Sequence, residues 1–292
     1  MPVCEVCFHH CQLKEGGRGV CGARICRDGV IVPENYGKIT SLALDPIEKK
    51  PLARFYPGSY ILSAGSYGCN LHCPFCQNYE IARREEMLRS DASLRGISLY
   101  RDISPEEMAG IAAAYQKRGN IGIAFTYNEP LISYEYILDT ARLVHQNGMK
   151  CVLVTNGTAS LDVLEKLVPY IDAMNIDLKG FTDHYYSDVL HGDRQMTMDF
   201  IREAVKHCHV ELTTPIVPRE NDSLEEIDQL ASWVASLADV YGGKNGSDIP
   251  LHISRFFPRY RMTDRGPTSV RLIYQLAEIA RRHLTYVYTG NC

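Results

Sequence analysis

The chain has 292 residues, of which 45% are hydrophobic and 23% charged, a composition typical of soluble globular proteins. Its formal net charge of −4 gives no reason to expect nucleic-acid binding, and no apolar run reaches the roughly 18 residues that span a bilayer. The N-terminus, MPVCEVC, lacks a basic region followed by an apolar one, so no signal peptide is expected. Eleven cysteines without an export signal indicate metal ligation in a reducing compartment, and the expected location is the cytoplasm.

The first 26 residues are predicted to form a small Cys-rich metal-binding segment. A segment this short and glycine-rich cannot bury a core, so a bound metal would supply its folding energy. Thiolates suit both a structural zinc ion and an auxiliary iron–sulfur cluster. These are two alternatives for the segment, and the third is a reduced segment without metal. The predicted ligands are Cys4, Cys7, Cys11 and Cys21, with His9, His10 and Cys26 as substitutes.

Residues 27 to 57 are predicted to be short strands and turns. Pro46 and Pro51 bracket a lysine pair and exclude a helix between them, because proline disfavours helical backbone in itself and in the residue before it. The pair, Lys49 and Lys50, is interpreted as a solvated connector.

Three cysteines in CNLHCPFC, at Cys69, Cys73 and Cys76, follow a predicted strand at Tyr60–Gly68. Each thiolate of such a loop can point at one corner of a cubane iron–sulfur cluster. Four-iron clusters usually take four cysteines. With three, one iron keeps an open position, as catalytic zinc sites do. The alternatives are structural thiols or a zinc knuckle, but a knuckle needs four ligands.

Beyond this loop, predicted strands and helices alternate. This pattern indicates a parallel α/β sheet with right-handed crossovers, either doubly wound or closed towards a barrel. Residues 1–57 are therefore predicted to be the N-terminal segment and connector, and residues 58–292 the α/β body. The predicted helices are 104–118, 132–146, 161–170, 199–207, 224–237 and 269–282, and the predicted strands are 121–127, 151–157, 174–180, 209–217, 251–257 and 284–290.

Reactive groups of parallel α/β folds collect at the carboxyl ends of the strands. Asn128 and Glu129 follow the strand at 121–127, and we expect both to be exposed there, with the Glu129 carboxylate available to a ligand amino group. Asn156 ends the next strand and can offer a donor and an acceptor to a ribose diol.

Two later strand ends carry charged residues. Asp177 and Lys179 have the same parity and share a face, where Lys179 is either a partner for a ligand carboxylate or substrate, or half of a structural ion pair. Arg255 is a candidate for binding an anionic group. A strand histidine such as His252 is more often a satisfied core residue, but it is kept as a cofactor-binding candidate.

The loop CNLHCPFC resembles the CxxxCxφC signature of radical S-adenosylmethionine (SAM) enzymes. The resemblance implies that Cys69, Cys73 and Cys76 bind a 4Fe–4S cluster whose open iron is chelated by SAM. It also implies reductive cleavage of SAM to a 5′-deoxyadenosyl radical, which abstracts hydrogen from a substrate. A partial (βα)6 barrel is the implied fold, with Phe75 near the adenine. TYNEP resembles the GGEP motif, which implies that Glu129, and less closely Asn128, binds the SAM amino group.

VTNG and IDLKG resemble segments of the pyruvate formate-lyase activating enzymes, a similarity that extends over Tyr60–Gly290. A narrower similarity, to the radical SAM protein of the AmmeMemoRadiSam group, rests on CEVCFHHC, SLALDPIEKKPL, CNLHCPFCQNYEIA, TYNEP, DLKG and HISRFFP. The activating-enzyme branch implies an oxidoreductase that acts on a glycyl-radical enzyme and takes electrons from a flavodoxin- or ferredoxin-like donor. The alternatives are radical modification of another protein or a small molecule, and a non-catalytic zinc-knuckle binding protein.

Overall fold

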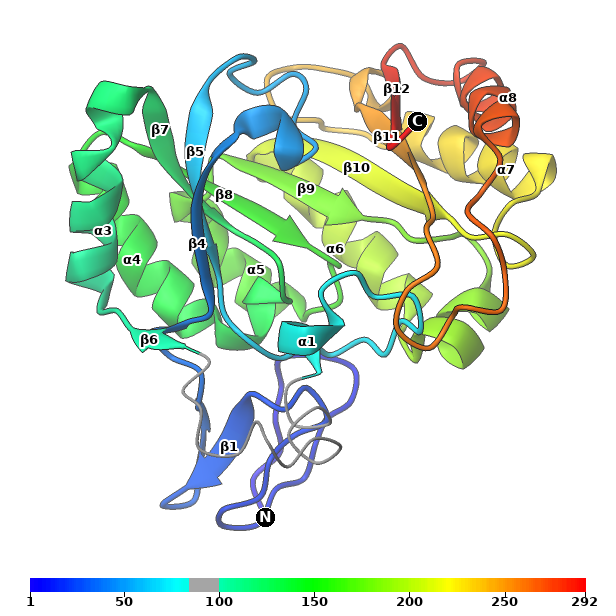
Figure 1. Cartoon of the computed structure of the whole chain (residues 1–292). Helices are drawn as coiled ribbons and strands as arrows, with labels where there is room; N and C mark the ends of the chain where they lie inside the picture. Colours follow the sequence, from blue (N-terminus) through cyan, green and yellow to red (C-terminus); the bar gives the residue numbers. More distant parts are fainter. Residues whose placement is uncertain (84–99) are drawn as a thin grey trace.

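The computed structural model describes residues 1–83 and 100–292. The strands of its main sheet are β4 (Ser41–Pro46), β5 (Tyr60–Gly65), β7 (Asn120–Phe125), β8 (Lys150–Thr155), β9 (Ala173–Asp177), β10 (His209–Ile216), β11 (Leu251–Arg255) and β12 (Val287–Gly290). In the described part of the chain these eight strands lie in the order β12-β11-β10-β9-β8-β7-β5-β4 (Figure 1). β4 pairs antiparallel with β5 at one edge, and the other neighbouring pairs are parallel.

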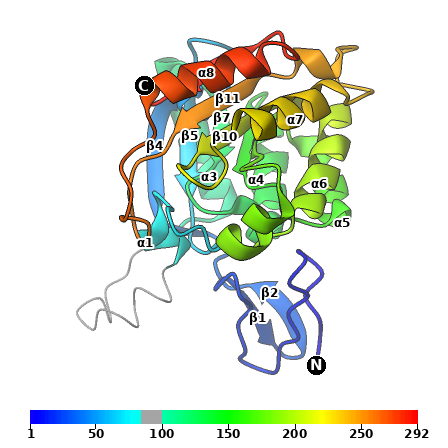
Figure 2. The ribbon, with the colours of Figure 1, turned by 90° about the vertical axis from the view of Figure 1, so that its right-hand side faces the viewer.

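The helices that connect the parallel strands are α3 (Pro105–Ala114), α4 (Tyr134–Gln146), α5 (Leu161–Leu167), α6 (Arg194–His207), α7 (Leu224–Ala235) and α8 (Val270–Ala280). They lie outside the curved sheet (Figure 1, Figure 2). Among the described strands, the edge strands β4 and β12 do not pair with each other, so the sheet is open. The predicted α/β fold of partial-barrel type is confirmed.

Helix starts follow the capping residues. Ser104 Oγ accepts from the Glu107 N–H at 3.2 Å, and the Glu107 carboxylate accepts from the Ser104 N–H at 2.8 Å, which completes a capping box at α3. α6 begins well before the predicted start near Asp199, because the Asp193 carboxylate accepts from the Met196 N–H at 2.9 Å and caps the helix there.

The connector between β4 and β5 fills part of the barrel interior. Its apolar side chains Ile47, Leu52 and Phe55 form one buried cluster with Ile61, Ala124, Val152 and Ala173. A 3₁₀ turn, Ile47–Lys49, lies where any helix was excluded. That expectation is wrong because so short a turn uses i→i+3 hydrogen bonds and tolerates a proline before it.

The two lysines of the connector have different environments. Lys49 has a 67% exposed side chain, as predicted, but Lys50 is only 2% exposed. The prediction of a solvated connector is therefore wrong for Lys50, whose Nζ lies 3.0 Å from Asp45 Oδ2 and 4.7 Å from the centre of the Tyr127 ring. The ion pair compensates the charge that the connector carries into the barrel.

Glu211, on β10, fastens the connector from inside the sheet. Its fully buried carboxylate accepts from the backbone N–H groups of Ala53 and Arg54 at 2.9 and 2.7 Å. It also bonds His209 and His252 at 2.9 and 2.7 Å. Burial opposes its charge, but these donors outweigh burial and lower the pKa of Glu211 to about 2.

The N-terminal segment projects from the barrel beside α1 (Tyr79–Ala82) (Figure 1, Figure 2). It contains the antiparallel pair β1 (Arg24–Arg27) and β2 (Val30–Pro33), while β3 (Lys38–Ile39) pairs with β6 (Arg101–Asp102). Arg24 joins the segment to α4 through both carboxylate oxygens of Glu135, at 2.8 and 3.1 Å. Within residues 1–83 and 100–292, no helix has the length and apolar character to cross a membrane.

Candidate active site

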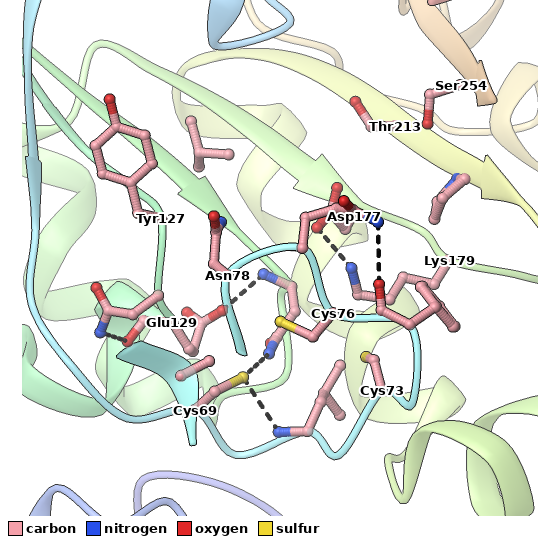
Figure 3. Close-up of a pocket in the computed structure, with 18 of the residues that line it drawn as sticks. Cys69, Cys73, Cys76, Asn78, Tyr127, Glu129, Asp177, Lys179, Thr213 and Ser254 are labelled. Atoms are coloured by element: carbon pink, nitrogen blue, oxygen red, sulfur yellow. Dashed lines mark hydrogen bonds and ion pairs between the residues drawn. The ribbon is translucent and has the colours of Figure 1, made fainter. Parts of the chain in front are cut away.

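A cavity of about 500 Å³ opens at the carboxyl edge of the sheet (Figure 3). Its wall is formed by the loop between β5 and α1 and by the residues that end or follow β7, β8, β9, β10 and β11. The predicted site residues that line it are Cys69, Cys73, Phe75, Cys76, Asn128, Glu129, Asn156, Asp177, Lys179 and Arg255. The tertiary structure thus brings predicted side chains from five separate segments to one cavity.

Three cysteines occupy one side of the cavity (Figure 3). Cys69, Cys73 and Cys76 are free thiols of intermediate exposure. The loop starts at Gly68, whose φ of +90° suits glycine and whose position leaves no room for a side chain, since a Cβ there would lie 2.7 Å from the Cys21 carbonyl oxygen. The Cys69 N–H donates to that same carbonyl at 3.1 Å, so the loop is held against the N-terminal segment.

The thiols have raised pKa values because they are buried. Burial raises the pKa of Cys73 to about 11 and also raises those of Cys69 and Cys76, while the positive charge of Arg83 opposes the shift at all three. Lys179 opposes it at Cys73 and Cys76. Thiols with such pKa values hold their protons at neutral pH, so a metal group that binds them must displace protons.

The arrangement of these groups fits an iron–sulfur cluster. No three Cys, His, Asp or Glu side chains of the described ranges converge as the ligands of one metal ion would. The ligands of a cubane cluster do not converge on a single point, because each thiolate binds a different iron atom. Among the buried donor atoms without an acceptor in the described structure are Tyr185 Oη and Arg83 Nη2, and Tyr185 packs in the same apolar cluster as Cys73. A sulfur-rich, negatively charged group would supply acceptors there.

Glu129 is buried, at 2% exposure, so the prediction that it stands exposed at the strand end is wrong. Its Oε1 accepts from the Leu131 N–H and the Thr155 hydroxyl at 3.0 and 2.6 Å, and its Oε2 accepts from the Asn156 N–H at 2.8 Å. An ionised carboxylate has about four acceptor positions, so Oε2 has room for one further donor. Burial, against these three hydrogen bonds, raises the pKa of Glu129 to about 7.

The two predicted asparagines of the cavity wall, Asn128 and Asn156, are hydrogen-bonded to neighbouring chain atoms. Asn128 is half-buried rather than exposed, and its Oδ1 accepts from the Ser66 N–H at 2.9 Å, which shapes the approach to the cysteine loop. Asn156 Nδ2 donates to Asn70 Oδ1 at 2.9 Å and lies 3.7 Å from Cys69 Sγ. Asn70, fully buried, therefore links the end of β8 to the cysteine loop.

Asp177 and Lys179 form an ion pair inside the cavity, with 2.7 Å between Asp177 Oδ2 and Lys179 Nζ (Figure 3). β9 ends at Asp177, earlier than predicted, and Lys179 lies just beyond it. Burial disfavours the ammonium, but the charge and hydrogen bond of Asp177, together with Cys73, outweigh burial and hold the pKa of Lys179 above its usual range. The cavity therefore contains a permanent cation beside the thiols.

Strand β11 contributes one predicted residue to the cavity and not the other. Arg255 lines the wall, donates through Nε to the Thr268 carbonyl at 2.6 Å, and stacks over the Phe257 ring. His252 is not part of the wall and bonds Glu211 deep in the sheet. Its assignment to cofactor binding is wrong, because it lies at the start of the strand, away from the carboxyl edge.

The cavity wall also contains residues that the sequence analysis did not name as site residues. Tyr127 has a left-handed backbone, with φ of +73°, and donates its hydroxyl to Asp45 Oδ2 at 2.8 Å. Thr213 and Ser254 face the cavity from β10 and β11 (Figure 3). Thr213 and Ser254 could have been identified from the alternation of side chains along a strand and from the collection of reactive groups at the carboxyl ends of strands. Tyr127 could have been identified because it directly precedes Asn128 and Glu129.

The predicted N-terminal ligands gather around a second, very small cavity of about 10 Å³. Its wall includes Cys4, Cys7, Cys11 and Cys21 together with His9 and His10. Cys26 is not part of this wall and lies 3.8 Å from a carboxylate oxygen of Glu15. Burial, together with the neighbouring thiols and against hydrogen bonds, raises the pKa of Cys7 to about 11. His9 Nε2 bonds the Asn70 carbonyl at 2.8 Å, so this segment touches the cysteine loop a second time.

The open parallel barrel and its thiol-lined cavity define the class of this protein, an α/β partial barrel whose reactive groups gather at the carboxyl edge. The chain belongs to the radical SAM superfamily, whose family model matches residues 64–233, more than half of the chain. It is therefore a radical SAM enzyme, and membership implies a 4Fe–4S cluster and SAM as cofactors.

Relatives extend this assignment. MJ0808, an uncharacterized protein of Methanocaldococcus jannaschii, is 37% identical over 99% of this chain and 80% of its own length. The pyruvate formate-lyase-activating enzyme of Clostridium pasteurianum is 24% identical over 59% of this chain and 68% of its own. Streptococcus suis SuiB bound to S-adenosylmethionine has a similar fold, with a TM-score of 0.56 at 14% identity, and the match covers 77% of this chain and 48% of that one.

Proposed function

We propose that Cys69, Cys73 and Cys76 hold the 4Fe–4S cluster and that the enzyme generates a radical on a protein substrate, as in glycyl-radical enzyme activation. The observation that carries this proposal is the single cavity in which the three thiols face Glu129 and Lys179. When bound, the reduced cluster supplies the electron that cleaves SAM to methionine and a 5′-deoxyadenosyl radical, which takes a hydrogen atom from the substrate.

The charged residues of the cavity would position SAM. Glu129 accepts the amino group of SAM at the remaining acceptor position of Oε2, in a charge-assisted hydrogen bond. Lys179 binds an anionic group, either the SAM carboxylate or the substrate, and Asp177 orients its ammonium group. Arg255, from the opposite wall, has Nη donors for a second anionic group.

The uncharged residues would enclose the rest of SAM. Phe75, 7% exposed in the wall, packs beside the adenine, and its ring meets Phe256 edge-on at 6.1 Å. Asn156 lies at the ribose, where its position is set by Asn70. Asn128 supports the loop through Ser66 and acts on SAM only through that support.

The first test is SAM cleavage. Anaerobically reconstituted protein with dithionite should convert SAM to methionine and 5′-deoxyadenosine without a protein substrate, because the cavity holds cluster ligands and SAM ligands together. If 5′-deoxyadenosine accumulated no faster than with cluster-free protein, the proposal of SAM cleavage would be contradicted. The result would then favour the alternative of a non-catalytic zinc-knuckle binding protein.

A label distinguishes the substrate classes. A peptide with α-deuterated glycine should transfer deuterium to 5′-deoxyadenosine if the enzyme activates glycyl-radical enzymes, with a low-potential flavodoxin- or ferredoxin-like donor as the cytoplasmic reductant. SAM cleavage without transfer from glycine favours modification of another protein or a small molecule. The 24% identical activating enzyme of Clostridium pasteurianum supports the first reading, and the narrower resemblance to the AmmeMemoRadiSam group leaves the substrate open.

We also propose that Cys4, Cys7, Cys11 and Cys21 hold a separate structural metal, zinc or an auxiliary cluster. The supporting observation is the common small cavity that these four thiols line, although in the described residues they do not converge on one point as the ligands of a single ion would. Replacing all four by Ser should remove either one zinc ion or the iron of one cluster in elemental analysis, and should lower the thermal stability while the catalytic cluster remains. The matched control is Cys26→Ser, which removes a thiol of the same segment outside the cavity. Unchanged metal content in the four-site variant contradicts this proposal.

A further inference from the structure

Arg83 is a buried arginine that follows α1 and lies behind the cysteine loop. It is 8% exposed, its N–H donates to the Tyr79 carbonyl at 2.8 Å, and its Nη1 lies 3.0 Å from His72 Nε2. His72 is itself part of the loop, between Cys69 and Cys73. The backbone bond ties Arg83 to α1, and the contact with His72 holds its guanidinium against the loop that carries the thiols.

The charge of this guanidinium has no carboxylate partner among the described residues, and its Nη2 is buried without an acceptor. Other buried cations of the chain are paired. Arg24 binds both oxygens of Glu135, and Lys50 binds Asp45. A buried charge without a counter-charge costs several kcal/mol on the order-of-magnitude scale of ion desolvation. Among the described residues, no carboxylate supplies the anion that the buried charge of Arg83 requires.

The thiols are the groups on which this charge acts. The guanidinium contacts His72, which lies between Cys69 and Cys73, so its charge lies beside the loop that carries the thiols. Lys179 lies on the cavity side, where it shares the wall with Cys73 and Cys76 and is paired with Asp177. A cluster on three thiolates is negatively charged and becomes more so on reduction. Net charge and hydrogen bonds to sulfur are two determinants of the reduction potential of such clusters.

We propose that Arg83 is the counter-cation of the iron–sulfur cluster and raises its reduction potential by stabilising the charge added on reduction. This inference rests on the proposed cluster site. Arg83 acts from behind the loop: the cavity wall includes Ala82 but not Arg83, so the guanidinium is not placed to touch SAM. It is a positioning and charge-compensating residue, and its effect belongs to the electron-transfer step.

The test is a redox titration of the reconstituted enzyme. The electron paramagnetic resonance signal of the reduced cluster monitors the titration and gives the midpoint potential. Arg83→Gln should shift the midpoint potential to a more negative value at unchanged iron content, because it keeps polar donors and removes the charge. Arg83→Lys should leave the potential close to that of the parent. The control, Arg118→Gln, removes a positive charge from the exposed turn before β7 and should leave it unchanged. SAM affinity should be the same in all four proteins.

An unshifted potential in cluster-loaded Arg83→Gln overturns the inference, and so does an equal shift in Arg83→Lys, since charge would then not be the cause. Weaker SAM binding with an unchanged potential would also overturn it and assign Arg83 to the SAM site. If Arg83→Gln folds but fails to assemble a cluster that Arg83→Lys does assemble, the need for a counter-cation is supported. A parent protein that binds no cluster at Cys69, Cys73 and Cys76 refutes the proposed function itself, a result distinct from these.

Discussion

The triple variant Cys69→Ala, Cys73→Ala, Cys76→Ala should lose the oxygen-labile four-iron cluster and all reductive SAM cleavage. The physical reason is that each thiolate holds one iron, so no partial site remains after all three are removed. Electron paramagnetic resonance of the dithionite-reduced protein should show no low-potential cluster signal. The rate of 5′-deoxyadenosine formation should fall to the rate measured with dithionite and SAM in the absence of protein.

The fold should survive this change, because the three thiols lie at the cavity edge and are only half-buried. Cys208→Ala is the matched control: it removes a buried thiol from the barrel core, where its Sγ lies 3.8 Å from the Ala204 carbonyl, and should leave the cluster intact. A triple variant that kept the cluster signal would move the catalytic site to the N-terminal cysteines and overturn the assignment.

Glu129→Ala should weaken SAM binding by roughly ten- to a hundredfold while the cluster stays in place, since a hydrogen bond to a charged group contributes about 1.5–3 kcal/mol. Among the described residues of the cavity wall, Glu129 and Asp177 carry the carboxylates, and Asp177 is paired with Lys179. Isothermal titration calorimetry with SAM on the reconstituted protein measures the effect.

The same substitution leaves the Asn156 N–H and the Thr155 hydroxyl without their acceptor, so some loss of stability accompanies it. Glu226→Ala provides the control, because Glu226 is also a buried carboxylate that accepts from a backbone N–H, that of Phe181, at 2.6 Å. It lies outside the cavity and should lose stability without losing SAM affinity. Calorimetry that gave equal SAM affinity for Glu129→Ala and the parent would place the SAM amino group elsewhere.

The alternation of strands and helices and the capping signals were sufficient to predict a parallel α/β sheet, whereas the choice of a partial barrel over a doubly wound sheet came from the resemblance to radical SAM enzymes. These signals are local: Ser104 caps α3 through a residue three positions away, and the apolar runs of the strands mark a sheet buried on both faces. The strand ends were less accurate. β9 stops at Asp177 and β12 starts at Val287, because strand length is set by pairing with neighbours that are distant in sequence.

For the site, sequence by itself determined the cysteine spacing and the residues at the strand ends, because both depend on order along the chain and on strand parity. Only the tertiary structure decided which site residues are buried and which hydrogen-bond and ion-pair partners they have. Glu129 is enclosed by Leu131, Thr155 and Asn156 where exposure was expected. Such contacts join segments far apart in the chain, and no local pattern encodes them.

The contacts around the cysteine loop have the same origin. The π-helical turn Tyr185–Leu190 binds the loop through the Leu190 carbonyl, which accepts from the His72 N–H at 2.8 Å, and no sequence pattern marks it. Arg83 belongs to no motif, and its importance rests on a buried charge that lacks a carboxylate among the described residues. Spacing along the chain specifies which groups can bind a cofactor, whereas the electrostatic environment of those groups is set by residues that only folding brings beside them.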